Sequence, residues 1–178
     1  AEIAINWGRS FRISRKFSCA PRAFAVQWQG LQGGIRLNIL VSACLLGAYC
    51  RFDGQLIEDE RVTALAEKHT LIPVCPELYG GLPTPRLPGE KRDGRVYDKS
   101  GADVTEFYEK GAEAALRFAN LTGCKYAVLK ARSPSCGVGI VYDGSFSGKL
   151  VPGDGVTASL LRQNGITVLT PDQLDELG

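Results

Sequence analysis

The sequence predicts a three-layer α/β fold with a largely parallel, Rossmann-like sheet and cysteine-bearing loops at the carboxyl ends of its strands. Short, mainly apolar runs of strand length alternate with segments in which apolar residues recur at helical spacing. Runs that are apolar on both faces are typical of strands buried in a parallel sheet. The chain has 178 residues, 44% of them hydrophobic, so we expect one domain with a substantial core.

Residues 1–36 carry five arginines and one lysine but a single acidic residue, Glu2, and show no sustained helical or strand period. A transit-like peptide is one interpretation of such a basic segment. An irregular N-terminal extension is the favoured interpretation. We therefore expect the α/β domain to span residues 37–178.

The domain begins with a predicted βαβ unit, in which residues 37–43 (LNILVSA) and 71–74 (LIPV) are strands and residues 58–68 form the helix between them. A long helix follows, with Asp103 as its N-cap and Glu106 at the capping-box position. Its apolar face consists of residues at helical spacing: Val104, Phe107, Tyr108, Gly111, Ala115, Phe118 and Ala119.

The remaining elements complete the sheet and its helical cover. They are, in order, a buried strand at 126–130 (YAVLK), a hairpin within 138–151, a helix at 156–163 ended by Asn164-Gly165, a strand at 166–170, and a short helix opened by Pro171. Residues 75–101 contain four prolines and several glycines. A connection of this length in a compact domain favours a lid or a binding loop.

Composition excludes several classes of partner. The net charge of +2, from 21 basic and 19 acidic residues, is too small to indicate a nucleic acid polymer or an anionic membrane surface. No apolar run reaches 18 residues, and the N-terminus lacks the core of a signal peptide, so we expect a cytoplasmic protein without a membrane span. Nothing in the sequence indicates an oligomer, although one is compatible with it.

Six cysteines in a reducing compartment favour metal binding or catalysis over disulfides. Cys44 follows the first predicted strand, Cys75 the second, and Cys136 the third after a short loop. Because the carboxyl ends of parallel strands share one edge of the sheet, we expect these three thiols to meet there. The alternative is that each cysteine packs as a small hydrophobic residue.

Thiolate-rich sites select zinc, copper(I) or iron-sulfur clusters. Structural zinc sites use close C-x-x-C pairs, which this sequence lacks, whereas a 4Fe-4S cluster accepts scattered cysteines. Three cysteines for four irons leave one iron open to act as a Lewis acid. Cys50 is either an alternate ligand or, as we favour, a thiol beside the site, and Cys124 is expected to pack in the core.

Several segments together resemble the thiouracil desulfurases of the TudS type, a family once defined only as a domain of unknown function. They are LVSACLLGAYCRFDG, PVCPELYGGLPTPR, KARSPSCG and YDGSFSGKLVPGDGVTASLL, and the resemblance covers about residues 37–172. It implies that Cys44, Cys75 and Cys136 ligate a 4Fe-4S cluster. It also implies a small thiocarbonyl substrate, 2-thiouracil or a related thiobase or thionucleoside, from which sulfur is removed without redox change and released as sulfide.

Addition of water to a thiocarbonyl carbon requires a general base. Glu77, two residues after Cys75, is the favoured candidate, and Asp53 in C-R-F-D-G is the second. The alternative for Glu77 is a solvated carboxylate or an ion-pair partner of Arg51 or Arg86.

The loops beside the cysteines supply candidates for orienting the substrate. Either Ser133 or Ser135 can relay a proton, and Ser135, adjacent to Cys136, is the favoured one; a turn-stabilising hydrogen bond is the alternative role. Substrate binding is assigned to Ser133, Lys130, Arg86 and Gly81. Two other functions stay open: an iron-sulfur sensing or sulfur-binding module without turnover, and a metal-free α/β protein with core thiols.

Overall fold

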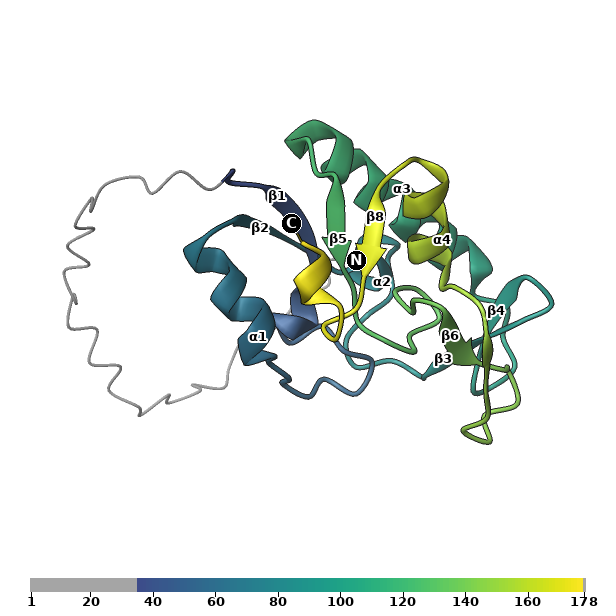
Figure 1. Ribbon diagram of the computed structural model, residues 1–178. Coiled ribbons are helices and arrows are strands. Elements are labelled where there is room, and N and C mark those ends of the chain that lie inside the picture. Colours follow the sequence, from purple (N-terminus) through teal and green to yellow (C-terminus); the bar gives the residue numbers. More distant parts are fainter. Residues whose placement is uncertain (1–34, 178) are drawn as a thin grey trace, which may run out of the picture. The chain divides into compact units, whose positions relative to one another are not determined.

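A four-stranded parallel sheet forms the centre of the computed structural model, which describes residues 35–177 (Figure 1). The strand order is β2-β1-β5-β8, and each neighbouring pair is parallel. The strands are β1 (Asn38–Ser42), β2 (Thr70–Val74), β5 (Tyr126–Val128) and β8 (Thr167–Leu169). The predicted parallel α/β fold is confirmed, whereas the predicted N-terminal extension lies almost entirely outside the described residues.

The central strand β1 is buried on both faces of the sheet, which explains its continuous apolar run Ile39–Val41. Ile39, Leu40 and Val41 of β1 are completely inaccessible to solvent. Leu40 packs into the hydrophobic cluster on one face of the sheet, and Ile39 and Val41 pack into the cluster on the other face. Successive side chains of a strand point to opposite faces, so β1 contributes to both cores.

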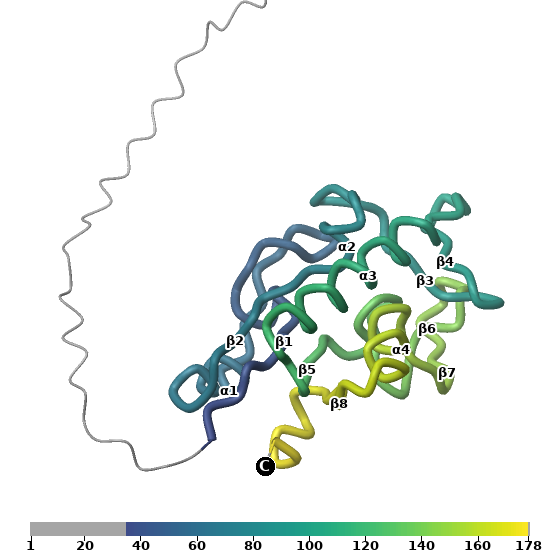
Figure 2. Tube along the Cα trace, turned by 90° about the horizontal axis from the view of Figure 1, so that it is seen from above, coloured from purple at the N-terminus to yellow at the C-terminus, as the bar shows by residue number. Residues whose placement is uncertain are grey.

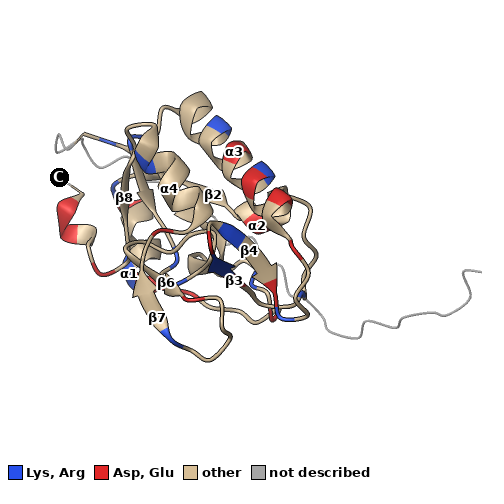
Figure 3. Cartoon of the chain, turned by 90° about the vertical axis from the view of Figure 1, so that its right-hand side faces the viewer, with Lys and Arg blue, Asp and Glu red and all other residues tan. Residues whose placement is uncertain are grey.

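Helices cover the two faces and give the three predicted layers (Figure 1). The helices α3 (Thr105–Thr122) and α4 (Val156–Gln163) pack together on one face. The other face carries α1 (Glu60–Thr63) and two 3-10 turns, η2 (Ala64–Glu67) and η3 (Leu174–Glu176). Figure 3 shows charged residues of both signs along the outer surface of α3. Among the described residues, no helix is long and apolar enough to cross a bilayer.

Two helices differ from their predictions at the level of single residues. The capping box at Asp103 is wrong: α3 begins at Thr105, whose backbone N–H donates to Asp103, and Glu106 pairs with Lys110 at 2.6 Å instead of reaching back to the cap. The predicted helix at 58–68 is split into α1 and η2. Thr63 at the break donates its hydroxyl to the Glu60 carbonyl, a bond that competes with regular helix geometry.

The segment predicted as a long loop, 75–101, contains regular structure. It forms the short helix α2 (Pro76–Tyr79) and a hairpin of β3 (Gly89–Arg92) and β4 (Arg95–Asp98). A second hairpin, β6 (Ile140–Tyr142) with β7 (Leu150–Pro152), confirms the prediction for 138–151. The two hairpins lie side by side at one end of the described domain (Figure 2).

The backbones of the helices α2 and α3 are in direct contact. A Cβ atom on Gly111 of α3 would stand 1.9 Å from the carbonyl oxygen of Pro76, and one on Gly80 would stand 1.8 Å from that of Phe107. Only glycine permits this approach. The contact fixes α2, and with it the residues at the end of β2.

Candidate functional site

A pocket of about 530 Å³ lies at the carboxyl ends of β1, β2 and β5. The chain leaves β1 toward α1 on one face of the sheet, whereas the chain leaving β5 reaches α4 on the other. Such a switch point opens a crevice between the two strands. Their ends are joined by a hydrogen bond of 2.9 Å from the Lys130 backbone N–H to the Ser42 hydroxyl.

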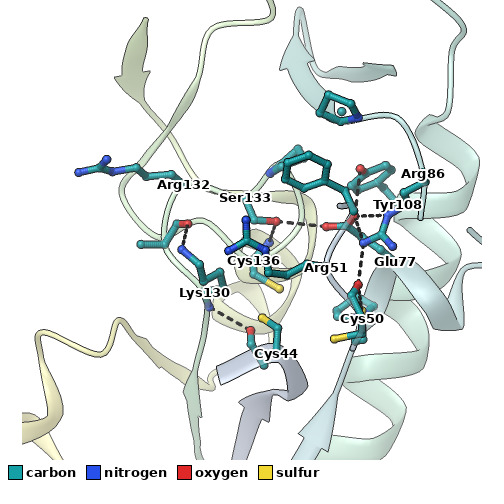
Figure 4. A pocket seen from close by; sticks show the side chains of 18 of the residues that line it. Cys44, Cys50, Arg51, Glu77, Arg86, Tyr108, Lys130, Arg132, Ser133 and Cys136 are labelled. Carbon is teal, nitrogen blue, oxygen red and sulfur yellow. Dashed lines mark hydrogen bonds and ion pairs between the residues drawn. The ribbon is translucent and has the colours of Figure 1, made fainter. Parts of the chain in front are cut away.

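Four of the five cysteines in the described residues line this pocket, and none of the five forms a disulfide. Cys44 lies in the 3-10 turn η1 (Ala43–Leu45) that follows β1, Cys75 precedes α2, and Cys136 lies in the loop after β5. Figure 4 shows the side chains of Cys44, Cys50 and Cys136 directed toward the same space. The structure thus brings the three thiols selected from the sequence to one pocket, with Cys50 beside them, as the sequence analysis favoured.

The loop that carries Cys136 is held by its own hydrogen bonds. The Ser133 hydroxyl accepts bonds of 3.1 Å from the backbone N–H groups of Ser135 and Cys136, and the Gly137 N–H donates to the Ser133 carbonyl. Gly155 packs beneath the loop, where a Cβ atom would lie 2.3 Å from the Ser135 carbonyl oxygen. These contacts hold the backbone of the loop that carries the Cys136 sulfur.

The thiols of the pocket have raised pKa values. Burial raises the pKa of Cys136 to about 12. Contact with the Cys44 thiol, together with burial, raises the pKa of Cys50 to about 11, although contact with the Cys75 thiol opposes this shift. Contact with the Cys50 thiol, and then burial, raises the pKa of Cys75 far above its usual range. A metal that binds these sulfurs has to displace their protons.

The arrangement of the thiols suits a polynuclear metal group. Among residues 35–177, no three His, Cys, Asp or Glu side chains converge closely enough to hold a single metal ion. Several sulfurs nevertheless line the same pocket, and sulfur is the donor that iron-sulfur clusters require. The sulfur donors that line the pocket therefore fit an iron-sulfur cluster chemically.

A buried ion pair forms the wall of the pocket beside the thiols. The Arg86 guanidinium donates from Nη2 and Nε to Oε2 of Glu77, at 2.6 and 2.8 Å, and the two side chains are only 7% and 14% exposed. The Tyr108 hydroxyl donates to the same oxygen at 3.4 Å. Glu77 therefore both lines the pocket, as a candidate base must, and pairs with Arg86, as the alternative interpretation expected.

The two candidate serines lie in different places. Ser133 lines the pocket, and its hydroxyl donates to Oε1 of Glu77 at 3.3 Å (Figure 4). Ser135 is completely buried outside the pocket lining, where its hydroxyl bonds to that of Thr157 at 2.8 Å. Of the two serines, only Ser133 therefore lines the pocket, which weighs against the expected role of Ser135 as the proton relay.

Lys130 lines the pocket, but two other sequence candidates do not. Lys130 donates from Nζ to the Ala131 carbonyl at 3.4 Å.

Asp53 lies outside the pocket lining, and its carboxylate pairs with Arg51 at 2.7 Å. Desolvation raises the pKa of Asp53, but hydrogen bonds from Arg51 and the Gln55 backbone outweigh it and leave the pKa below its usual range. Gly81 also lies outside, beside the ring of Phe107.

The structure adds pocket residues that the sequence did not single out. They include Arg51, Glu90, Tyr108, Arg132 and Tyr142. Tyr108 belongs to the apolar stripe of α3, so its spacing indicated a core residue. Glu90 is a buried carboxylate that accepts the backbone N–H groups of Gly144 and Phe146, and it ties β3 to the turn between β6 and β7. No local motif marks Glu90 for this role.

Comparison with known proteins relates the chain to one family over most of its length. The sequence model of the 2-thiouracil desulfurase family matches residues 39–173. The protein YbbK of Bacillus subtilis (strain 168), itself uncharacterized, is 40% identical over 149 residues, which are 78% of this chain and 99% of YbbK. The solved structure of the [4Fe-4S]-dependent thiouracil desulfidase TudS is 45% identical, with a TM-score of 0.73 over 80% of this chain and 95% of that one.

These matches include all three strand ends that line the pocket. The family match begins within β1 and ends beyond β8, so it contains Cys44, Cys75, Cys136 and Glu77. The sequence match and the structural match point to the same family. The chain belongs to the 2-thiouracil desulfurase family.

Proposed function

We propose that this protein exchanges the C=S group of a thiolated pyrimidine, such as 2-thiouracil, for C=O at a 4Fe-4S cluster. In the balanced reaction, water adds at the thiocarbonyl carbon, its oxygen stays as the carbonyl, and the sulfur leaves as sulfide. The observation that carries the proposal is the pocket in which strand-end cysteines lie beside the buried pair of Glu77 and Arg86. Family membership and the likeness to TudS support it.

Cys44, Cys75 and Cys136 are the proposed ligands of the cluster. They come from the ends of three parallel strands and line one pocket. The cluster would supply a soft Lewis acid that holds the substrate sulfur and makes it a better leaving group. Cys50 lines the same pocket, and we place it outside the ligand set.

Glu77 is the proposed general base for the attacking water. Arg86 and Tyr108 occupy its Oε2 atom, whereas Oε1 faces Ser133 in the pocket. The fixed Oε2 leaves Oε1 as the oxygen that can accept a proton from water. The Ser133 hydroxyl orients Oε1 and can itself exchange a proton with it.

Lys130 is the proposed contact for an oxygen of the pyrimidine. Its ammonium group lines the pocket and donates only to a backbone carbonyl among the described residues, so further hydrogens stay available. Arg86 has its guanidinium committed to Glu77, to the Pro83 carbonyl and to Thr84. We therefore propose that Arg86 positions the base rather than the substrate.

The test is sulfide release by the anaerobically reconstituted protein. Incubation with 2-thiouracil should give uracil and sulfide in equal amounts, and related thiopyrimidine nucleosides and nucleotides in the same assay define the substrate. The Glu77→Gln variant should keep its cluster and lose turnover. A wild-type protein that carries the cluster but releases no sulfide from any thiopyrimidine would contradict the proposal and favour a sensing or sulfur-binding module.

A further inference from the structure

Glu90 is a buried acidic residue in the pocket wall whose charge the fold does not neutralise. It lies in β3, its side chain lines the pocket, and the residue is only 8% exposed. Among residues 35–177, no lysine or arginine lies within ion-pair distance of its carboxylate. Burial of a carboxylate without a cation is costly, so hydrogen-bond donors have to compensate for it.

Only one of the two carboxylate oxygens of Glu90 finds donors within the described part of the chain. Oε2 accepts the backbone N–H groups of Gly144 and Phe146, at 3.0 and 2.8 Å, and neither donates to Oε1. No side-chain oxygen or nitrogen of the described residues is both buried and without a hydrogen-bond partner, so Oε1 is accessible. Because Glu90 lines the pocket, we infer that this accessible oxygen opens into it.

The bonds from Glu90 to the turn between β6 and β7 do not by themselves require a charged side chain. A glutamine has the same length, and its amide oxygen can accept the same two N–H groups. What the carboxylate adds is a second acceptor, Oε1, in place of an amide nitrogen that only donates. The chemistry of Oε1 therefore suits a ligand that donates a hydrogen bond.

Glu90 lies in the same part of the pocket as the proposed general base. The preceding residue, Gly89, also lines the pocket, and a Cβ atom on it would stand 2.6 Å from the Tyr108 hydroxyl. That hydroxyl donates to Glu77 at 3.4 Å. The backbone of β3 thus lies against the group that contacts Glu77, which places the acceptor on Glu90 beside the site of the proposed chemistry.

We propose that Oε1 of Glu90 accepts the N3–H group of the thiopyrimidine and thereby selects thiouracil-type over thiocytosine-type bases. This inference rests on the proposed function. N3 lies between C2 and C4, so it neighbours the thiocarbonyl whichever of these carbons carries the sulfur, and, unlike N1, it does not carry the sugar of a nucleoside. In uracil-type bases N3 bears a hydrogen, whereas in cytosine-type bases it is an acceptor. An ionised carboxylate can only accept, so it favours the first and disfavours the second.

The test compares wild type with Glu90→Gln, both anaerobically reconstituted. Isothermal titration calorimetry with uracil and cytosine measures the binding of two bases that contain no sulfur and are not turned over. Wild type should prefer uracil by at least about tenfold, the usual effect of one hydrogen bond to a charged group. In the variant, the amide oxygen can keep the bonds to Gly144 and Phe146, and the amide nitrogen replaces Oε1. The preference for uracil should therefore fall at least about tenfold.

A purely structural role of Glu90 would not change this preference. Loss of the turn would weaken the binding of both bases alike, and the missing C4 oxygen of cytosine affects both proteins equally, so the change in the ratio isolates Glu90. The control Glu109→Gln, on the exposed side of α3, should keep the wild-type ratio. If Glu90→Gln does not fold, wild type decides alone: 1-methyluracil should bind, and 3-methyluracil, which lacks the N3 hydrogen, should not.

The ratio of kcat/KM for sulfide release from 2-thiouracil and from 2-thiocytosine should change in the same direction as the binding ratio. Equal binding of uracil and cytosine to wild type, binding of neither, or an unchanged ratio in Glu90→Gln would overturn the proposal. Selective binding of uracil without sulfide release from 2-thiouracil would instead contradict the proposed function and leave the role of Glu90 standing.

Discussion

The hydroxyl of Ser133 donates a 3.3 Å hydrogen bond to Oε1 of Glu77, although the two residues are 56 positions apart in the sequence. Ser133 belongs to the loop after β5, and Glu77 belongs to α2 after β2, so the bond crosses the end of β1 between them. The opposite oxygen of Glu77 is held by Arg86. Glu77 is thus oriented from two sides in the pocket that the cysteines following three strands line.

Replacement of Glu77 by Gln should lower kcat for sulfide release by about 10²- to 10⁴-fold, the usual contribution of a general base. The amide cannot accept a proton at neutral pH, although its shape is nearly unchanged. The visible spectrum and iron content of the reconstituted variant check that the cluster is retained. The matched control is Glu113→Gln on the exposed side of α3, and equal activity of the two variants would contradict the assignment.

Replacement of Ser133 and of Ser135 by alanine should have different effects. The Ser133→Ala variant should lose at least about tenfold in kcat, because Oε1 of Glu77 loses its oriented donor. The Ser135→Ala variant should lose mainly stability, about 1–3 kcal/mol, because the buried hydroxyl of Thr157 loses its partner. Steady-state kinetics and urea unfolding of both proteins separate the two effects; a larger kcat loss in Ser135→Ala would reverse the assignment.

Replacement of Arg86 by Met should destabilise the metal-free protein by about 3–5 kcal/mol, because it leaves the buried Glu77 carboxylate without its cation. The variant also removes a donor to the Cys50 carbonyl. Urea unfolding measures the change in free energy. Arg95→Met, which breaks an exposed pair with Asp103, is the control and should change stability far less. Similar losses in both variants would show that burial of the Glu77 pair has no energetic consequence.

Replacement of Gly111 by alanine should force α2 away from α3. The new Cβ atom would stand 1.9 Å from the Pro76 carbonyl oxygen, so the cost should reach or exceed the ~1–3 kcal/mol typical of overpacking. Because Cys75 and Glu77 flank Pro76, iron retention and turnover should fall together with the melting temperature. A Gly111→Ala protein as stable as Glu109→Ala, altered on the exposed side of the same helix, would show that this close approach is not required.

The sheet could be predicted because burial on both faces leaves a direct mark on the sequence. Every residue of Ile39–Val41 is apolar, and α4 was predicted with its observed bounds because Asn164-Gly165 ends it. The helix α2 could not be predicted, since it depends on the close approach of Gly80 and Gly111 to distant backbone. The β3–β4 hairpin is largely charged, so it lacks the alternating apolar pattern of a strand.

The convergence of the thiols could also be predicted, because strand order and direction are enough to bring Cys44, Cys75 and Cys136 to one edge. The choice between Ser133 and Ser135 could not. Both flank Pro134, and only the packing of Thr157 beneath the loop decides which hydroxyl faces the pocket. Tertiary contacts of this kind leave no local signal in the sequence.

The most direct test of the account is the iron and acid-labile sulfide content of anaerobically reconstituted cysteine variants. Wild type should hold about four irons and four sulfides per chain, the composition of a 4Fe-4S cluster. Cys44→Ser, Cys75→Ser and Cys136→Ser should each lose most of the iron, whereas Cys50→Ser and Cys124→Ser should keep it. Zinc in place of iron in the wild type, or a full cluster in any of the first three variants, would contradict the proposed site.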